Sequence, residues 1–198
     1  MPPSKRIHRE DILQAALKII GQGGLEDINA RRIARELNCS VQPIFANFKN
    51  MDDLINETVS RIYGKYKDYI ADGAKQEKPY RGMGLAYIKF AKDYPAYFKV
   101  LFMQNIQKEP VSYIMDDDAG EETIRRGMEM SGFTYEQQKD FHVKVMFFTH
   151  GMAALLATGT VKMSDEEIER LLTEGVGEMV LGIKAGDRSG ERAERQKG

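Results

Sequence analysis

The sequence predicts an all-α protein with two domains. Apolar residues recur at helical spacing through most of the 198 residues, and no segment alternates apolar and polar residues as a strand would. With 42% apolar and 30% charged residues, the chain has the composition of a globular protein that buries a core. We expect a helix-turn-helix domain over residues 1–50, a larger helical domain for ligand binding and dimerisation over residues 51–185, and a disordered tail over residues 186–198, which is almost devoid of apolar side chains.

Three short amphipathic helices are expected in the first 50 residues. The first has an apolar stripe over residues 12–20 and ends at the glycines within residues 21–24. The second begins after Asn29, a residue type that caps helix N-termini, and ends at a turn where Asn38 tolerates the left-handed conformation. The third runs over about residues 40–47. Two short helices joined by a tight turn are the pattern of a helix-turn-helix.

Further helices are expected in the rest of the chain. Asn50 caps the next helix, and Ser164 with Glu167 forms a capping box at the start of the last one. Residues 104–121 read as an extended loop. The apolar patterns place the helices at residues 50–66, 79–92, 95–102, 121–130, 135–157 and 164–183.

Composition also indicates the cellular compartment in which the protein is expected to lie. The single Cys39 excludes an internal disulfide framework and fits a reducing cytosol, and the first residues lack the apolar core of a signal peptide, so we expect a cytoplasmic protein. Residues 145–161 carry no formal charge, but 17 residues fall just short of a membrane span. We expect a buried helix there and no membrane partner.

A basic bias at the N-terminal end points to an anionic partner. The first 49 residues hold eight basic and five acidic side chains, against 21 and 25 in the remainder. In a helix-turn-helix, the second helix of the pair enters the major groove of DNA. Its side chains must then be short, polar and not acidic. The face expected to meet this condition as a whole consists of Ser40, Val41, Gln42, Ala46 and Asn47, and it holds no acidic residue.

Each predicted DNA contact has a chemical reason. The amides of Gln42 and Asn47 can read base edges, and Val41 can touch a thymine methyl group. Arg31, Arg32 and Lys49 are placed to meet phosphates, although charged residues at such positions also occur as a solvated face.

Residues 28–54, INARRIARELNCSVQPIFANFKNMDDL, resemble the DNA-binding domain of the TetR family of repressors. The resemblance rests on the Ile33-Ala34 pair, Leu37-Asn38 at the turn, Phe45, Phe48 and Leu54. Residues 12–28 are also similar to the first helix of that family. A weaker likeness to the effector domain of one subgroup lies in residues 89–103 and in the His-Gly pair within residues 147–156.

Four positions depart from the usual family pattern. Phe45 stands where the family has a Tyr that bonds a phosphate, and Met51 replaces a Lys, so two backbone contacts are lost. Asn38 replaces the turn Gly, which its left-handed tolerance absorbs. Pro43 falls early in the recognition helix, where its missing N–H costs little. We expect weaker affinity for DNA, with Pro43 and Phe45 still at the DNA-facing surface.

The resemblance implies how such a protein works. A homodimer formed through the last two helices would bind a palindromic operator in double-stranded DNA, and a small apolar ligand in the larger domain would release it. Each of the residues proposed to bind that ligand could instead belong to an ordinary packed core, and this alternative applies most strongly to His150. These residues, drawn from a wider aromatic and Met set that includes Tyr66, are Tyr63, Tyr87, Phe90, Phe98, Phe102, Met146, Phe147 and His150.

Two other classes of protein compete with a regulator. We find no GxGxxG, Walker, HExxH or GxSxG motif, and therefore expect no catalytic residues, cofactor or metal. A helical interaction or small-molecule-binding protein that has lost specific DNA binding is the remaining alternative, and Phe45 and Met51 motivate it. Binding to DNA and its dependence on salt separate these readings.

Overall fold

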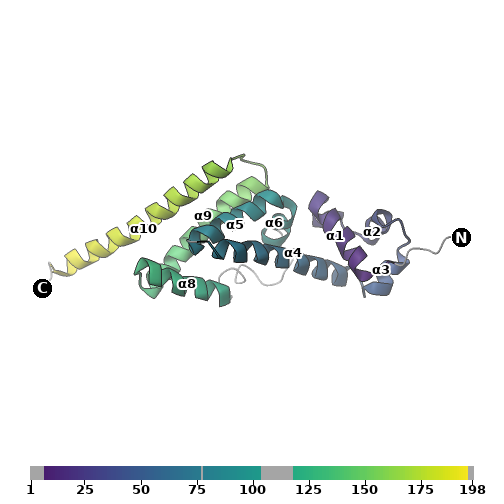
Figure 1. The fold of residues 1–198 in the computed structure, drawn as a ribbon, viewed down its shortest axis with the longest axis horizontal. Coiled ribbons are helices and arrows are strands. Elements are labelled where there is room, and N and C mark those ends of the chain that lie inside the picture. The colour runs from purple at the N-terminus through teal and green to yellow at the C-terminus, as the bar shows by residue number, and fades with distance from the viewer. Residues whose placement is uncertain (1–6, 77, 104–117, 196–198) are drawn as a thin grey trace.

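The computed structural model describes residues 7–76, 78–103 and 118–195. In these ranges every regular element is a helix, which confirms the predicted all-α class. The molecule is elongated: α1 to α3 form a unit at one end, the larger helical body lies beside it, and α10 projects away at the other end (Figure 1). Among the described residues, no helix is both long and apolar enough to cross a membrane.

The N-terminal unit contains α1 (Arg9–Gly23), the 3₁₀ turn η1 (Leu25–Asp27), α2 (Ala30–Glu36) and α3 (Gln42–Asn47). Apolar side chains from all three α-helices are almost completely buried together, among them Ile12, Ile33 and Ile44. The Asn29 side chain caps α2 by accepting the Arg32 N–H at 2.9 Å, as the sequence predicts. This small core holds α2 and α3 in a fixed relative orientation.

The turn between α2 and α3 depends on Asn38. Its φ of +51° is left-handed, and Asn38 is the one residue other than glycine with positive φ in the described chain. The Cys39 N–H donates to the Ala34 carbonyl at 2.9 Å, and the Asn38 N–H donates to the Arg35 carbonyl at 3.1 Å. These two bonds form a Schellman motif, in which glycine is the usual residue at this position and asparagine the next best.

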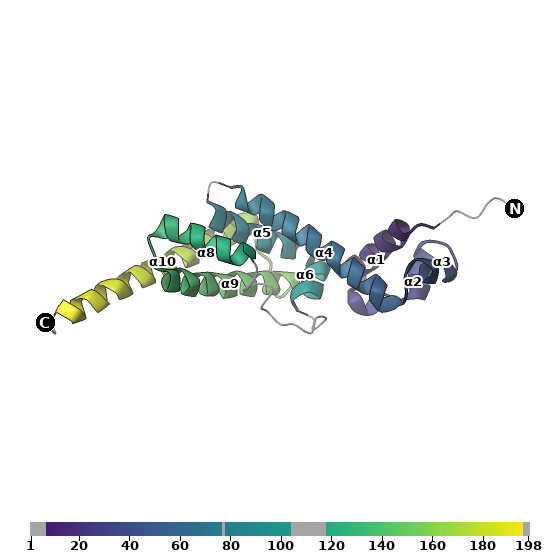
Figure 2. The same cartoon turned by 90° about the horizontal axis from the view of Figure 1, so that it is seen from below.

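Helix α4 (Met51–Ala74) connects the two parts of the molecule (Figure 2). Asn50 caps it by accepting the Asp53 N–H at 2.8 Å, while the Asp53 carboxylate accepts the Lys49 N–H at 3.0 Å. Helix α4 is one unbroken helix that begins directly after α3 and packs along α5 in the body, so it belongs to both parts of the molecule.

The body packs α5 (Pro79–Asp93) between α4 and α9 (Tyr135–Ala157). Around this layer lie α6 (Pro95–Phe102), α8 (Asp118–Ser131) and α10 (Asp165–Arg195). Helices α4 and α5 approach closely at Gly73 and Gly82, where an added Cβ would lie 2.5 Å and 2.1 Å from the opposite carbonyl oxygen. The predicted capping box at Ser164 is confirmed, with its hydroxyl and Glu167 bonding reciprocally to the backbone.

Several predicted boundaries differ from the structure. Helix α10 continues to Arg195, so residues 186–195 of the expected disordered tail are helical. Their Arg, Glu and Ala residues favour helix, and a helix that is already formed adds further turns more easily than a new helix begins. Helix α3 begins at Gln42, two residues late, and α8 begins at Asp118. The rest of the loop expected over 104–121, and residues 196–198, lie outside the described residues.

Candidate nucleic-acid interface and aromatic cluster

The recognition helix α3 is held by one buried face. A helix of six residues is too short to be stable alone, so its position depends on tertiary contacts. Ile44 is fully buried and Phe48, directly after the helix, is nearly so. The Phe48 N–H also donates to the Ile44 carbonyl at 2.9 Å. With this face fixed in the core, the opposite face of α3 points away from the protein.

Six of the nine residues predicted to contact DNA are exposed to solvent. Ser40, Gln42, Arg31 and Lys49 are exposed, as are Val41 and the ring of Phe45, which is 50% exposed. A ring that large is rarely left in water without a reason, and here it stands at the middle of the recognition helix. The exposed residues of α3 and of the turn before it carry no charge, and Val41 and Phe45 make part of this surface apolar.

The other three predicted contacts are engaged within the protein. Arg32 forms an ion pair with Asp27, with 2.6 Å between Nη1 and Oδ2. The Asn47 side chain is half-buried and donates from Nδ2 to the Pro43 carbonyl at 2.8 Å. Pro43 is half-buried in the first turn of α3, where its missing N–H breaks no helical bond. These side chains stabilise the motif rather than facing outward freely.

Arg9 plays a part that the sequence did not indicate. Its guanidinium donates to the Asn47 carbonyl and to the Glu57 carboxylate, and its Cζ lies 3.9 Å from the centre of the Phe48 ring. The bond to Glu57 raises the pKa of Arg9 further. Arg9 thus joins α1, the end of α3 and α4. No local pattern could reveal it, because its partners lie 38 and 48 residues away along the chain.

In the body, five of the eight predicted ligand residues gather in one aromatic cluster. Its members are Tyr87, Phe90, Phe98, Phe102 and His150, together with Tyr66. Ring centroids are 5.1 Å apart for Tyr66 and Phe102, and 5.0 Å for Phe98 and Phe102. Such separations are typical of favourable ring contacts. The cluster is consequently a packed unit formed by α4, α5, α6 and α9.

One polar pair lies inside the aromatic cluster. Tyr87 Oη and His150 Nδ1 are 2.9 Å apart. Burial lowers the pKa of His150 below its ordinary value and raises that of Tyr87, so both groups are held neutral. A neutral hydroxyl and imidazole in an apolar surround can orient a ligand, or simply satisfy each other.

The remaining three predicted ligand residues lie outside the cluster or at its margin. Tyr63 lies beside the cluster, with 5.8 Å between its ring centroid and that of Tyr66. Met146 is half-buried, and Phe147 is 64% exposed on the outer face of α9. Sequence spacing alone could not separate the inner from the outer face, because apolar residues occupy both.

The outer face of α9 and α10 carries exposed apolar side chains. Phe147, Gly151 and Leu155 follow one another at intervals of four residues on α9, and Leu181 on α10 is 68% exposed. Apolar residues repeating on one helix face indicate a surface that another element covers. A cavity of about 420 Å³ lies between the same two helices, lined by residues that include Asp140, Lys144 and Met179.

The described residues show no group of three or more His, Cys, Asp or Glu side chains placed to hold a metal ion.

Thr149 Oγ1 is one of two side-chain polar atoms in the described part of the chain that are buried without a hydrogen-bond partner. It precedes His150 on α9 and lies close to Leu172 of α10, beside Gly84 of α5.

Comparison with known proteins agrees with this geometry. Residues 12–58 match the family described as bacterial regulatory proteins, tetR family. The crystal structure of a TetR-like transcriptional regulator from Rhodococcus sp. RHA1 has a similar fold, with a TM-score of 0.66 and 15% sequence identity over 92% of this chain and 99% of that one. No curated protein matches the chain by sequence. The N-terminal domain, over residues 12–58, therefore matches the tetR family of bacterial regulatory proteins, and nearly the whole chain has the fold of a TetR-like regulator.

Proposed function

We propose that the protein is a ligand-responsive transcriptional repressor that binds a palindromic operator as a homodimer. The observation that carries the proposal is the outward face of α3, which is uncharged, mixes polar and apolar side chains, and is fixed from behind by Ile44 and Phe48. A major groove admits one helix and is read by the first residues of that helix.

Specific side chains receive roles from their exposure. Gln42 reads a base edge, and Val41 and Phe45 make apolar contact with thymine methyl groups. Ser40, Arg31 and Lys49 bind phosphates and fix the register of the helix on DNA. Arg32 can join them by exchanging its partner Asp27 for a phosphate. Asn47 supports α3 through Pro43 and is a weaker candidate for base reading than the sequence suggested.

A dimer is supported by the outer face of α9 and α10. One recognition helix contacts too few base pairs to select a site in a genome, whereas a two-fold pair reads two half-sites. A two-fold interface uses the same surface patch on both chains. The exposed Phe147, Leu155 and Leu181 supply apolar surface for such a patch.

The aromatic cluster supports the response to a ligand. It joins α4 to the rest of the body through Tyr66, and α4 carries the DNA-binding domain. A small apolar ligand that enters between the rings, guided by Tyr87 and His150, would displace α4 and change the separation of the two recognition helices. It would act by binding the two conformations with different affinity. We assign no catalytic step, cofactor or metal, and place the protein in the cytoplasm.

Selection of bound sequences from a random duplex pool tests the proposal. The expected result is an inverted repeat whose half-sites lie about one helical turn, about 34–36 Å, or a multiple of it apart. Equal weak binding to every sequence would refute it. That outcome favours an interaction protein that has lost specific DNA binding, the reading that Phe45 and Met51 motivate.

Two variants on the selected site then test the roles within α3. Gln42→Ala should relax specificity at one base pair and cost about 1–3 kcal/mol on the preferred sequence. Lys49→Ala should weaken binding to all sequences alike and reduce the slope of log affinity against log salt by about one. If neither variant changes binding, α3 is not the recognition helix.

A further inference from the structure

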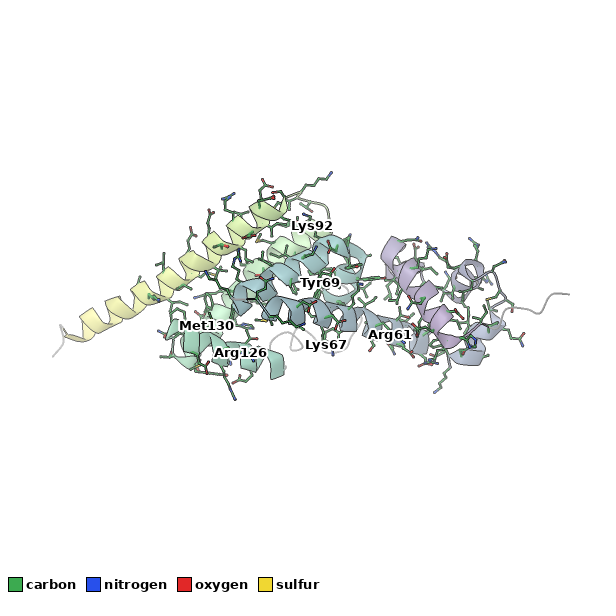
Figure 3. The ribbon with its side chains drawn as sticks, viewed as in Figure 1. Arg61, Lys67, Tyr69, Lys92, Arg126 and Met130 are labelled. Carbon is green, nitrogen blue, oxygen red and sulfur yellow. The ribbon has the colours of Figure 1, made fainter. Side chains whose placement is uncertain are left out.

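A cavity lies at the junction between the DNA-binding domain and the helical body. It has a volume of about 320 Å³ and is bounded by α1, α4 and the residues around the start of α6. Figure 3 shows Arg61 at this junction, where α4 passes α1. None of the predicted ligand residues of the aromatic cluster lines it. The lining residues that matter here are Leu17, Lys18, Arg61, Lys65, Tyr94 and Tyr97.

The cavity has a net positive lining. It contains three basic side chains and no acidic one. Lys18 and Arg61 are compensated from outside the cavity by ion pairs with Glu36 and Glu10. Lys65 differs, because no carboxylate in the described part of the chain pairs with its ammonium. That ammonium lies 4.4 Å from the centre of the Tyr94 ring. One positive charge is therefore left for a ligand to neutralise.

Two tyrosine rings form an aromatic part of the cavity lining. Tyr94 and Tyr97 stack with 5.5 Å between ring centroids and 7° between ring planes. The Tyr97 hydroxyl donates to the Leu17 carbonyl at 3.0 Å, which fixes the ring against α1. Burial raises the pKa of Tyr97, so this hydroxyl stays protonated. A ligand here meets two aromatic side chains beside one ammonium that has no carboxylate partner in the described part of the chain.

We propose that this junction cavity is a binding site for a small organic monocarboxylate. Its carboxylate pairs with the Lys65 ammonium, and its apolar part lies against Leu17 and the tyrosine rings. The volume is at the lower end of the range for small-molecule sites, which fits a ligand of one ring or a short chain. A second negative charge would face Glu10 and Glu36 and is disfavoured.

The position of the site gives it a consequence for DNA binding, which rests on the function proposed above. The cavity is lined from α1 on the DNA-binding side and from α4 and the start of α6 on the body side. A bound monocarboxylate therefore holds α1 against α4 and fixes the angle between the two parts. The ligand changes the affinity for DNA only if the angle that it fixes differs from the angle that the protein adopts on DNA.

Isothermal titration calorimetry of the full-length protein with benzoate, at low salt and without DNA, tests the site. Benzoate should bind once per chain, and its neutral analogue benzamide should bind at least about tenfold more weakly. Lys65→Met keeps most of the apolar stem and should weaken benzoate binding by at least about tenfold. Lys67→Met is the matched control: Lys67 is on the same helix and also lies over a ring, 5.2 Å from that of Tyr63, but does not line the cavity.

Four results would overturn the proposal: no saturable binding of benzoate, equal binding of benzamide, an equal loss in both lysine variants, or no loss in either. If Lys65→Met fails to fold by circular dichroism, Lys65→Gln and the benzamide comparison on the native protein decide the matter. Adding benzoate to the operator complex tests the consequence separately. An unchanged DNA affinity refutes the coupling but not the site, whereas failure to bind any DNA refutes the proposed function alone.

Discussion

Truncation of one buried side chain should detach the recognition helix from its support. Ile44 is fully buried and is the apolar residue by which α3 enters the core of the N-terminal unit. Ile44→Ala leaves the exposed residues of α3 unchanged but removes most of the contact that holds them. Because six residues do not maintain a helix unaided, the loss should be concentrated in α3.

The expected magnitude follows from the burial of this side chain. Ile44→Ala deletes three carbon groups, and the transfer of each to water is worth about 0.8 kcal/mol, or about 2.4 kcal/mol in all. The space left behind adds about 1 kcal/mol, since α3 lies at the surface and can settle partly into it. A total near 3.5 kcal/mol lowers the ratio of packed to detached α3 by about 300-fold.

Hydrogen exchange followed by mass spectrometry is the appropriate assay, since a protein with two domains has no single free energy of unfolding. Peptides covering residues 41–48 should exchange far faster in Ile44→Ala, and affinity for the selected DNA should fall with them. Ile88→Ala is the control, because Ile88 is equally buried but lies in the body. Unchanged exchange over residues 41–48, or an equal acceleration by Ile88→Ala, would refute the argument that Ile44 holds the recognition helix.

Three further predictions concern the turn, the aromatic cluster and the dimer. Asn38→Ala should destabilise the N-terminal unit by about 1 kcal/mol, because alanine adopts the left-handed conformation of this position less readily than asparagine does. Asn38→Gly should change stability by less, since glycine adopts that conformation freely. Equal melting temperatures for the two variants would contradict this reasoning. Burial lowers the pKa of His150 below 6.5, so the contribution of this residue to stability is fully present above about pH 6.5 and is lost as the pH falls through the lowered pKa. His150→Gln can still bond Tyr87 but does not titrate, and it should flatten this part of the curve of melting temperature against pH. An unaltered slope would show that His150 is not the source of the pH dependence. Leu181→Glu should dissociate the proposed dimer in analytical ultracentrifugation, whereas Met130→Glu, at a residue 65% exposed on α8, should not. A Leu181→Glu protein that still sediments as a dimer would place the interface elsewhere.

The sequence by itself determined the elements and the DNA-binding motif. Helix caps at Asn29 and Asn50 and the left-handed turn at Asn38 depend on residues within a few positions of one another, so local chemistry is enough to predict them. Helical periodicity also separates the buried Ile44 from the exposed Gln42 on α3, but it places Asn47 on the DNA-facing side, where the structure has this side chain half-buried and bonded to Pro43. The family resemblance rests on these local features.

Only the tertiary structure decided which side chains meet. No local sequence pattern predicts the role of Arg9, because its bonds to Asn47 and Glu57 join segments that are distant in sequence. Residues of like character were also divided by packing: Phe98 is buried in the aromatic cluster, whereas Phe147 faces outward. Residue type shows which side chains are apolar, and their spacing shows on which side of a helix they lie. Which neighbour covers that side depends on how the helices cross, and that is set by contacts along the whole chain rather than by any one segment.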